Sequence, residues 1–222
     1  LAAQLGGDTI EAYARKLGFG TEIGWRGDVY HDDAFVQLAE EEAGQLFHDD
    51  ASKQDGYALA QTGIGQRDVR VTPLQAAYMV VSLFHPEKKI YPRVVQSINY
   101  ANGDPYFSFP VKEEQHDDPI NPETLQTVRE LMRDVVTDGT ATHHLADAAW
   151  PLGGKTGTAQ IGETGNEHRW MIGYAPADHP QYAVSVVSRN GAGDNTHMQV
   201  FREIMDRLAV LQTDEEIDNK RG

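Results

Sequence analysis

The stretch AWPLGGKTGTAQ, residues 149–160, contains the pattern that most restricts the fold of this chain. Gly153 and Gly154 form a small, flexible connection to Lys155. The residues after Lys155 favour an extended segment. In a strand, the two-residue period would put the hydroxyls of Thr156 and Thr158 on one face. Gly157 between them has no side chain, so another backbone or a ligand could approach closely. A cation, two hydroxyls and strand-edge amides suit a ligand with a carboxylate and an extended peptide backbone.

Two other interpretations of this stretch are open. Gly154-Lys155-Thr156 is similar to the end of a phosphate-binding loop, G-x-x-x-x-G-K-[ST]. That loop needs its first glycine at position 149, where this chain has Ala149. It also needs a helix to follow, and Thr-Gly-Thr is a poor helix start. The other alternative is a glycine-rich turn that leads into an ordinary strand.

Lys-Thr-Gly also belongs to the signature of penicillin-binding proteins and class A β-lactamases. Around it, most of the chain resembles the C-terminal part of the transpeptidase domain of a class B penicillin-binding protein. The order and spacing of five blocks carry this resemblance. The blocks are LGFGTEIG (17–24), TGIGQRDVRVTPLQAA (62–77), GTA (139–141), GGKTGTAQ (153–160) and WMIGYAP (170–176). Relatives usually have a glycine after GIGQ, and this chain departs from them with Arg67.

The resemblance implies a mixed α/β (α+β) fold of the serine β-lactamase and D,D-peptidase type, an antiparallel sheet with flanking helices. It implies that residues 1–222 are the C-terminal portion of such a domain, whose N-terminal part is missing here. The implied activity is a serine D,D-transpeptidase that cross-links peptidoglycan stem peptides ending in D-Ala-D-Ala through an acyl-enzyme. Implied partners are stem peptides, β-lactam antibiotics and the missing N-terminal part. The implied location is the extracytoplasmic face of the bacterial membrane, with an anchor upstream.

The resemblance also implies roles for individual residues of the K-T-G segment. Lys155 would support the electrostatics and hydrogen bonding of the active site. The hydroxyls of Thr156 and Thr158 would hold the carboxylate of the substrate or of a β-lactam, beside Gly157. The backbone amide of Thr158 would form half of the oxyanion hole. Lys155 and Thr158 are therefore the candidate catalytic residues, and Thr156, Gly157 and Thr158 the candidate substrate-binding residues.

The nucleophile that this chemistry requires does not occur in the sequence. None of the serines is followed by lysine in an S-x-x-K pattern. S-x-N occurs at 97–99 and 188–190, in predicted strand ends, and we interpret both as chance matches. We therefore expect the 222 residues alone to form no acyl-enzyme.

Composition excludes several classes of protein and site. The chain has 19 basic and 34 acidic residues and a net charge of −15, which disfavours nucleic acid and anionic membranes as partners. Acidic runs at 40–50, 113–118 and 214–218 are typical of solvated surface. Without cysteine, neither a thiolate nucleophile nor a Cys-ligated metal is available. Histidines precede acidic pairs at 31–33, 48–50 and 116–118, but a metal-ligand spacing is lacking. We expect neither a metal nor another cofactor.

Periodicity predicts the following elements. One helix should begin at Asp8, which caps it, and the Glu11 side chain should reach back to the cap. A second should begin at Thr72, which caps it, and the Gln75 side chain should reach back in the same way. Residues 20–56 should form a loop with one short helix. A hairpin should turn at 102–105, and a helix should follow Asn121-Pro122. Three antiparallel strands over 154–160, 170–174 and 182–188 should pack against a helix over 196–211, which should bury Ile204. Residues 210–222 should be a frayed tail.

Three functional alternatives remain open at this stage. The first is a β-lactam sensor domain, which shares the motifs but lacks turnover. The second is a pseudo-enzyme or interaction domain, and the third is a nucleotide-binding module built on the Gly-Lys-Thr tripeptide. No run approaches the roughly 18 apolar residues that a membrane span needs. Because the chain opens in what looks like mid-helix sequence, we expect it to be a fragment whose start lies upstream.

Overall fold

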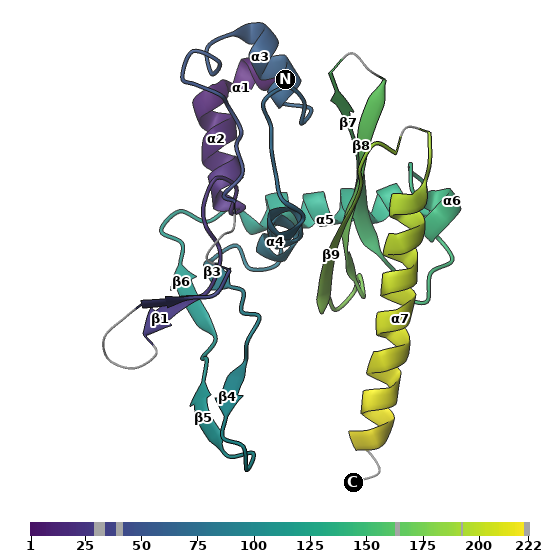
Figure 1. Cartoon of the computed structure of the whole chain (residues 1–222). Helices are drawn as coiled ribbons and strands as arrows, with labels where there is room; N and C mark the ends of the chain where they lie inside the picture. Colours follow the sequence, from purple (N-terminus) through teal and green to yellow (C-terminus); the bar gives the residue numbers. More distant parts are fainter. Residues whose placement is uncertain (29–33, 39–41, 163–164, 192, 220–222) are drawn as a thin grey trace. The chain divides into compact units, whose positions relative to one another are not determined.

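The computed structural model describes residues 1–28, 34–38, 42–162, 165–191 and 193–219 (Figure 1). The chain divides into two compact units, which are described separately. The first consists of Leu1–Gln75 and Phe84–Asn121, and the second of Ala76–Leu83 and Pro122–Gly222. Both helices and antiparallel strand pairs are present, as the predicted α+β class requires.

The first unit opens with helices α1 (Ala2–Leu5) and α2 (Gly7–Lys16). The prediction that Asp8 caps α2 is wrong, because Gly6 precedes the helix and provides no side-chain cap. Glu11 does not reach back either. It pairs with Arg15 at 3.0 Å, one turn on, and with Lys53 at 2.6 Å. Glu11, which had the spacing of a capping-box residue, forms ion pairs instead. The hydrogen bonds to Lys53 and Arg15 lower the pKa of Glu11.

Residues 20–56 differ from the prediction of a loop with one short helix. Their described part contains a pair of antiparallel strands, β1 (Arg26–Asp28) and β2 (Ala34–Val36), and no helix before Gly56. Trp25, just before β1, anchors this pair because its ring is buried edge-to-face against Phe109 at 5.1 Å. Short strands of this kind carry too few residues to show a two-residue period.

The predicted hairpin at 102–105 is confirmed and belongs to a longer antiparallel arm. Strand β4 (Ser97–Asn99) pairs with β5 (Pro105–Ser108), and the turn between them has Gly103 at φ 93°. Outside this pair, β3 (Lys88–Tyr91) meets β6 (Lys112–Gln115). Strand β6 was not predicted, since it lies in the acidic run at 113–118. Its side chains are exposed, as expected for that run.

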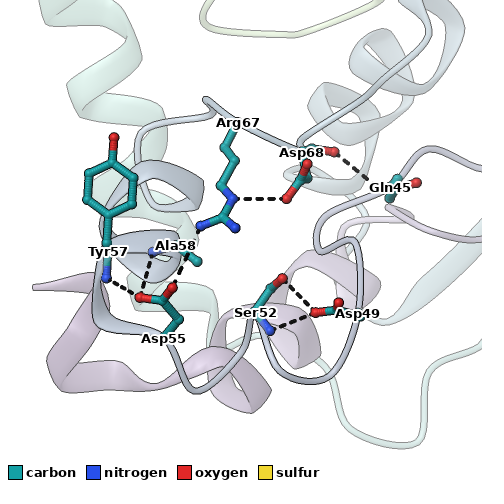
Figure 2. Close-up of polar contacts among 8 residues, drawn as sticks. All are labelled: Gln45, Asp49, Ser52, Asp55, Tyr57, Ala58, Arg67 and Asp68. Atoms are coloured by element: carbon teal, nitrogen blue, oxygen red, sulfur yellow. Dashed lines mark hydrogen bonds and ion pairs between the residues drawn. The ribbon is translucent and has the colours of Figure 1, made fainter.

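Helix α3 (Gly56–Thr62) begins at a capping aspartate that also faces an arginine. The Asp55 carboxylate accepts hydrogen bonds from the amides of Tyr57, at 2.8 Å, and Ala58, at 3.4 Å. Figure 2 shows the guanidinium of Arg67 between Asp55 and Asp68, with nitrogen–oxygen distances of 4.0 and 3.1 Å. Two carboxylates therefore hold this arginine over the start of α3.

The backbone of Arg67 has φ 64°, in the left-handed region. Only glycine adopts this left-handed conformation without a steric cost. Neighbouring contacts hold the backbone around it: the Gln45 amide side chain donates to the Asp68 carbonyl at 3.4 Å, and Gln45 and Arg70 exchange two backbone hydrogen bonds. Close by, Asp49 caps its own turn by accepting from the amide and hydroxyl of Ser52 (Figure 2).

Helix α4 (Pro73–Ser82) starts with the predicted threonine cap. The hydroxyl of Thr72 accepts a hydrogen bond from the Gln75 amide at 3.1 Å. The side chain of Gln75 does not reach back, contrary to the prediction. It is 1% exposed and donates to the carbonyl of Thr21 at 2.7 Å. Gln75 therefore ties the start of α4 to the loop that follows α2.

The second unit contains the predicted three-stranded antiparallel meander. Its elements are the part of α4 from Ala76 onward, α5 (Pro122–Thr137), α6 (Thr142–Leu145), β7 (Gly153–Ile161), β8 (Asn166–Ala175), β9 (Tyr182–Ser188) and α7 (Thr196–Asn219). The strand order is β7-β8-β9, so β7 is an edge strand among the residues that the structure describes. Helix α5 contacts β7, and α7 contacts β8 and β9 (Figure 1). The single turn α6 was not predicted.

Helix α7 covers the core of this unit. Phe201 and Met205 are buried against Met171 of β8, together with Leu145 and Val136. Ile204, predicted to face the sheet, is 37% exposed. The helix continues beyond residue 211 to Asn219, so the expected frayed tail, 210–222, is helical as far as that residue. Residues 220–222 lie outside the described part.

The described residues contain no helix with the length and apolarity needed to cross a bilayer. They also contain no group of three or more acidic or histidine side chains placed to hold a metal ion. The run at 31–33, which resembled a metal-binding motif, lies outside the described residues.

Replacing Arg67 tests whether the backbone at that position is strained. We expect Arg67→Gly to unfold with a free energy about 1 kcal/mol higher than Arg67→Ala, because both variants lose the ion pairs but only glycine removes the left-handed cost. Urea unfolding of the two variants measures this difference. Equal stabilities would show that residue 67 has no strained backbone.

A second prediction concerns His197, which is 4% exposed at the start of α7. Burial, with a smaller effect of nearby Arg169, lowers its pKa from the ordinary 6.5. The unfolded state therefore binds a proton more readily, and stability is lost as pH falls below about 6.5. We expect the free energy of unfolding to drop less between pH 7.5 and 5.5 in His197→Leu than in the parent. The matched control is Met198→Leu, at the next position, which is buried and carries no titratable group, and it should keep the parent's slope. An unchanged slope in His197→Leu would contradict the prediction.

Candidate functional site

The Lys-Thr-Gly segment lies in the middle of β7, which pairs with β8 along its whole length. Lys155 pairs with Ile172, Thr156 with Met171 and Thr158 with Arg169. The segment is extended, and no helix follows Lys155. The phosphate-binding-loop interpretation is therefore wrong, because that loop requires lysine at the start of a helix.

The side chains of the segment alternate between the two faces of the sheet, as predicted. Thr156 and Thr158 share one face, while Lys155 and Gly157 lie on the other. The Lys155 side chain is exposed, and its ammonium donates to the carbonyl oxygen of Thr156 at 2.5 Å. The ammonium therefore stays beside the main chain of Thr156.

Packing requires the two glycines that precede Lys155, so they do not form the flexible connection that the sequence suggested. A Cβ atom at Gly153 would lie 2.3 Å from the ring of Tyr174. At Gly154 it would lie 2.3 Å from the Met171 methyl group and 3.0 Å from the Ile172 carbonyl oxygen. Both glycines lie in β7 and are buried. They bring β7 close to the side chains of β8.

Tyr174 then connects this end of the sheet to helix α5. Its ring is 1% exposed, and its hydroxyl donates to the carbonyl oxygen of Arg129 at 3.1 Å. Burial raises the pKa of Tyr174, so this hydroxyl remains a donor at neutral pH. The first residues of β7 are thereby fixed before the strand reaches Lys155.

Gly157 differs from these glycines because packing does not require it. A Cβ atom there would meet only the Trp170 side chain, at 3.4 Å, which is ordinary contact. A side chain as small as a methyl group would therefore fit at this position. The lack of a side chain at Gly157 leaves room for a ligand backbone to approach β7 closely.

Edge position is the second property that suits β7 to an extended ligand. An edge strand can accept a further extended backbone by main-chain hydrogen bonding. The arrangement around Lys155 therefore suits the addition of an extended backbone to β7.

Sequence reasoning missed two residues near this strand. The hydroxyls of Thr140 and Thr156 lie 2.8 Å apart, although Thr140 belongs to the turn between α5 and α6. Arg169 pairs with Thr158 across the sheet, on the same face, and its charge is balanced by Glu167 at 3.0 Å. The GTA block at 139–141 was visible in the sequence, but nothing in it indicates which strand it contacts.

The two S-x-N matches do not contribute to this site. Residues 97–99 form β4 of the first unit. Ser188 ends β9, and β8 lies between that strand and β7. Neither match is placed beside Lys155 on its own strand or on the strand paired with it.

Comparison with known proteins identifies relatives over nearly the whole chain. The family model described as the penicillin binding protein transpeptidase domain matches residues 1–206. The chain is 28% identical over 194 residues to the peptidoglycan D,D-transpeptidase PbpA of Mycolicibacterium smegmatis, a match that covers 86% of this chain and 36% of that protein. It spans about a third of the length of the curated relatives that it matches.

Solved structures show the same fold. Pseudomonas aeruginosa PBP2, in complex with WCK 5153, matches with a TM-score of 0.72 and 28% identity over 93% of this chain and 45% of that one. Penicillin-binding protein A from M. tuberculosis, in its imipenem acyl-enzyme complex, gives 0.70 and 23% over 95% and 44%. The latter similarity supports the fold alone.

Alanine substitutions test which of the glycines in this sheet are required by packing. A Cβ atom at Gly173 of β8 would lie 2.4 Å from the Gly153 carbonyl oxygen and 2.9 Å from Phe201. We expect Gly173→Ala to lower the free energy of unfolding by about 2 kcal/mol or more through overpacking, and Gly157→Ala to change it by less than about 0.5 kcal/mol. Urea denaturation measures both. A Gly157→Ala variant as unstable as Gly173→Ala would give Gly157 a packing role.

Proposed function

Because this chain belongs to the family of penicillin-binding protein transpeptidase domains, we propose that it forms the K-T-G-bearing part of a peptidoglycan D,D-transpeptidase. The single observation that supports this most is the edge strand β7, which carries Lys155, Thr156 and Thr158 around Gly157, a glycine that packing does not require. The relatives' names give the reaction class, and the strand gives a surface for a peptide that ends in a carboxylate.

The substrate in this proposal is a stem peptide that ends in D-Ala-D-Ala. Its backbone would add to the edge of β7, and the hydroxyls of Thr156 and Thr158 would donate to its terminal carboxylate. Lys155 would contribute a positive charge within reach of the reacting groups. The amide of Thr158 would donate to the oxygen that becomes negative in the tetrahedral intermediate.

The reaction would be an acyl transfer through a serine ester. A serine hydroxyl attacks the carbonyl carbon of the penultimate D-alanine, and the terminal D-alanine leaves as the free amino acid. The amine of a second stem peptide then attacks the ester, forms the cross-link and releases the serine. Since S-x-x-K is lacking among these 222 residues, we propose that the serine comes from polypeptide outside them. The same serine would form an ester with β-lactams.

The proposed location is the extracytoplasmic face of the bacterial membrane, where peptidoglycan is cross-linked. This follows from the substrate, which lies outside the membrane.

Fluorescent penicillin tests the proposal at two levels. We expect no covalent label on the isolated 222 residues and a stoichiometric label on the natural protein that contains them. In that protein, Thr158→Val should slow acylation about ten- to a hundredfold, because a hydrogen bond to a charged group is lost. Label on a denaturing gel and stopped-flow rates provide the measurements.

The matched control is Thr127→Val on α5, where the hydroxyl only donates to the Glu123 carbonyl of its own helix. That variant should be acylated like the parent. A label on the isolated chain would show that it carries its own nucleophile. Unchanged acylation of Thr158→Val would remove this hydroxyl from the site.

A further inference from the structure

The turn after α5 brings a hydroxyl from outside the sheet to β7. The Thr140 and Thr156 hydroxyl oxygens are 2.8 Å apart, which is a hydrogen-bond distance for two hydroxyls. Thr140 is exposed and does not belong to a strand or helix. Its contact with the K-T-G segment therefore does not arise from sheet pairing or from burial.

The backbone around Thr140 is tightly held. The amide of Ala141 donates to the Val135 carbonyl at 3.0 Å, and the Thr142 hydroxyl donates to the Gly139 carbonyl at 2.9 Å. Ala141 is fully buried in the core. A Cβ atom at Gly139 would lie 2.6 Å from the Val135 Cα atom, so this turn needs glycine there. Contacts on both sides thus fix the position from which the Thr140 hydroxyl extends.

The chemistry of the ligand decides the direction of the hydrogen bond. A hydroxyl has one proton to donate and two lone pairs to accept with, whereas a carboxylate only accepts. If Thr156 gives its proton to a carboxylate, its oxygen can still accept the proton of Thr140. Donation from Thr140 then holds the Thr156 proton toward the ligand and strengthens the second hydrogen bond.

We propose that Thr140 is a positioning residue, whose hydroxyl orients that of Thr156 toward the terminal carboxylate of the bound peptide. This inference rests on the proposed function, because it assumes that the Thr156 hydroxyl faces a carboxylate. Thr140 does not touch the peptide in this scheme. It acts only through Thr156, so its effect depends both on that hydroxyl and on the charge of the ligand.

The test uses the natural protein that contains these residues, an excess of glycine as the amine that accepts the acyl group, and two peptides, acetylated L-Lys-D-Ala-D-Ala and its C-terminal amide. Release of D-alanine or D-alaninamide gives KM and kcat for each. We expect Thr140→Val to raise KM for the acid about three- to tenfold, the loss of one neutral hydrogen bond, with kcat nearly unchanged. KM for the amide should not change, and Thr140→Ser, which keeps the hydroxyl, should behave like the parent.

Two further variants separate positioning from a purely structural role. Thr137→Val removes a hydroxyl that only donates to the Arg133 carbonyl within α5, and it should leave both peptides unaffected. Thr140→Val combined with Thr156→Val should be no worse than Thr156→Val alone, because the first hydroxyl acts through the second.

Three results would overturn the inference. In the first, Thr140→Val raises KM equally for both peptides. In the second, its effect adds in full to that of Thr156→Val. A parent protein that binds the amide as well as the acid would be the third, and it would overturn the carboxylate site along with the role of Thr140. Failure to release D-alanine from either peptide would instead overturn the proposed function.

Discussion

The second unit depends on one constraint: side chains pack directly against the backbone of the sheet at its glycines. The Tyr174 ring lies over Gly153, and the Phe201 ring of α7 lies where a Cβ atom on Gly173 would contact it. These contacts are possible only where no Cβ intervenes. They hold β7 and β8 in one register, and the alternation of the Lys-Thr-Gly segment follows from that register. The position of the hydroxyls is thus determined by packing several residues away from them.

The elements that the sequence predicted well share a strong local signal. The strands around 154–160 and 182–188 and the helix after Pro122 each carry a sustained period or a clear start. The strands β1 and β2 do not, because each has only three residues and their stability depends on Trp25 and its distant partner Phe109. A local sequence pattern does not indicate packing between residues that are far apart in the chain. Capping patterns failed for a related reason: Glu11 and Gln75 had the right spacing, but both found other partners.

The candidate site shows the same division between local and distant information. Thr156, Gly157 and Thr158 follow one another in the chain, so a two-residue period was enough to arrange them. Thr140 reaches the same strand from the end of a helix, and that contact depends on how the turn packs on the core. The sequence contained the GTA block, yet only the folded chain pairs it with Thr156. Arg169 was missed for a similar reason, because its position opposite Thr158 depends on the register of β8.

The second edge of the three-stranded sheet has a practical consequence for work with the purified protein. Strand β9, which is rich in valine, is the edge opposite β7 in the strand order of the described residues. An unpaired edge strand invites pairing between molecules. The net charge of −15 keeps copies apart in dilute buffer. Salt screens that repulsion, so self-association through β9 should increase with ionic strength, and storage at low salt should limit it.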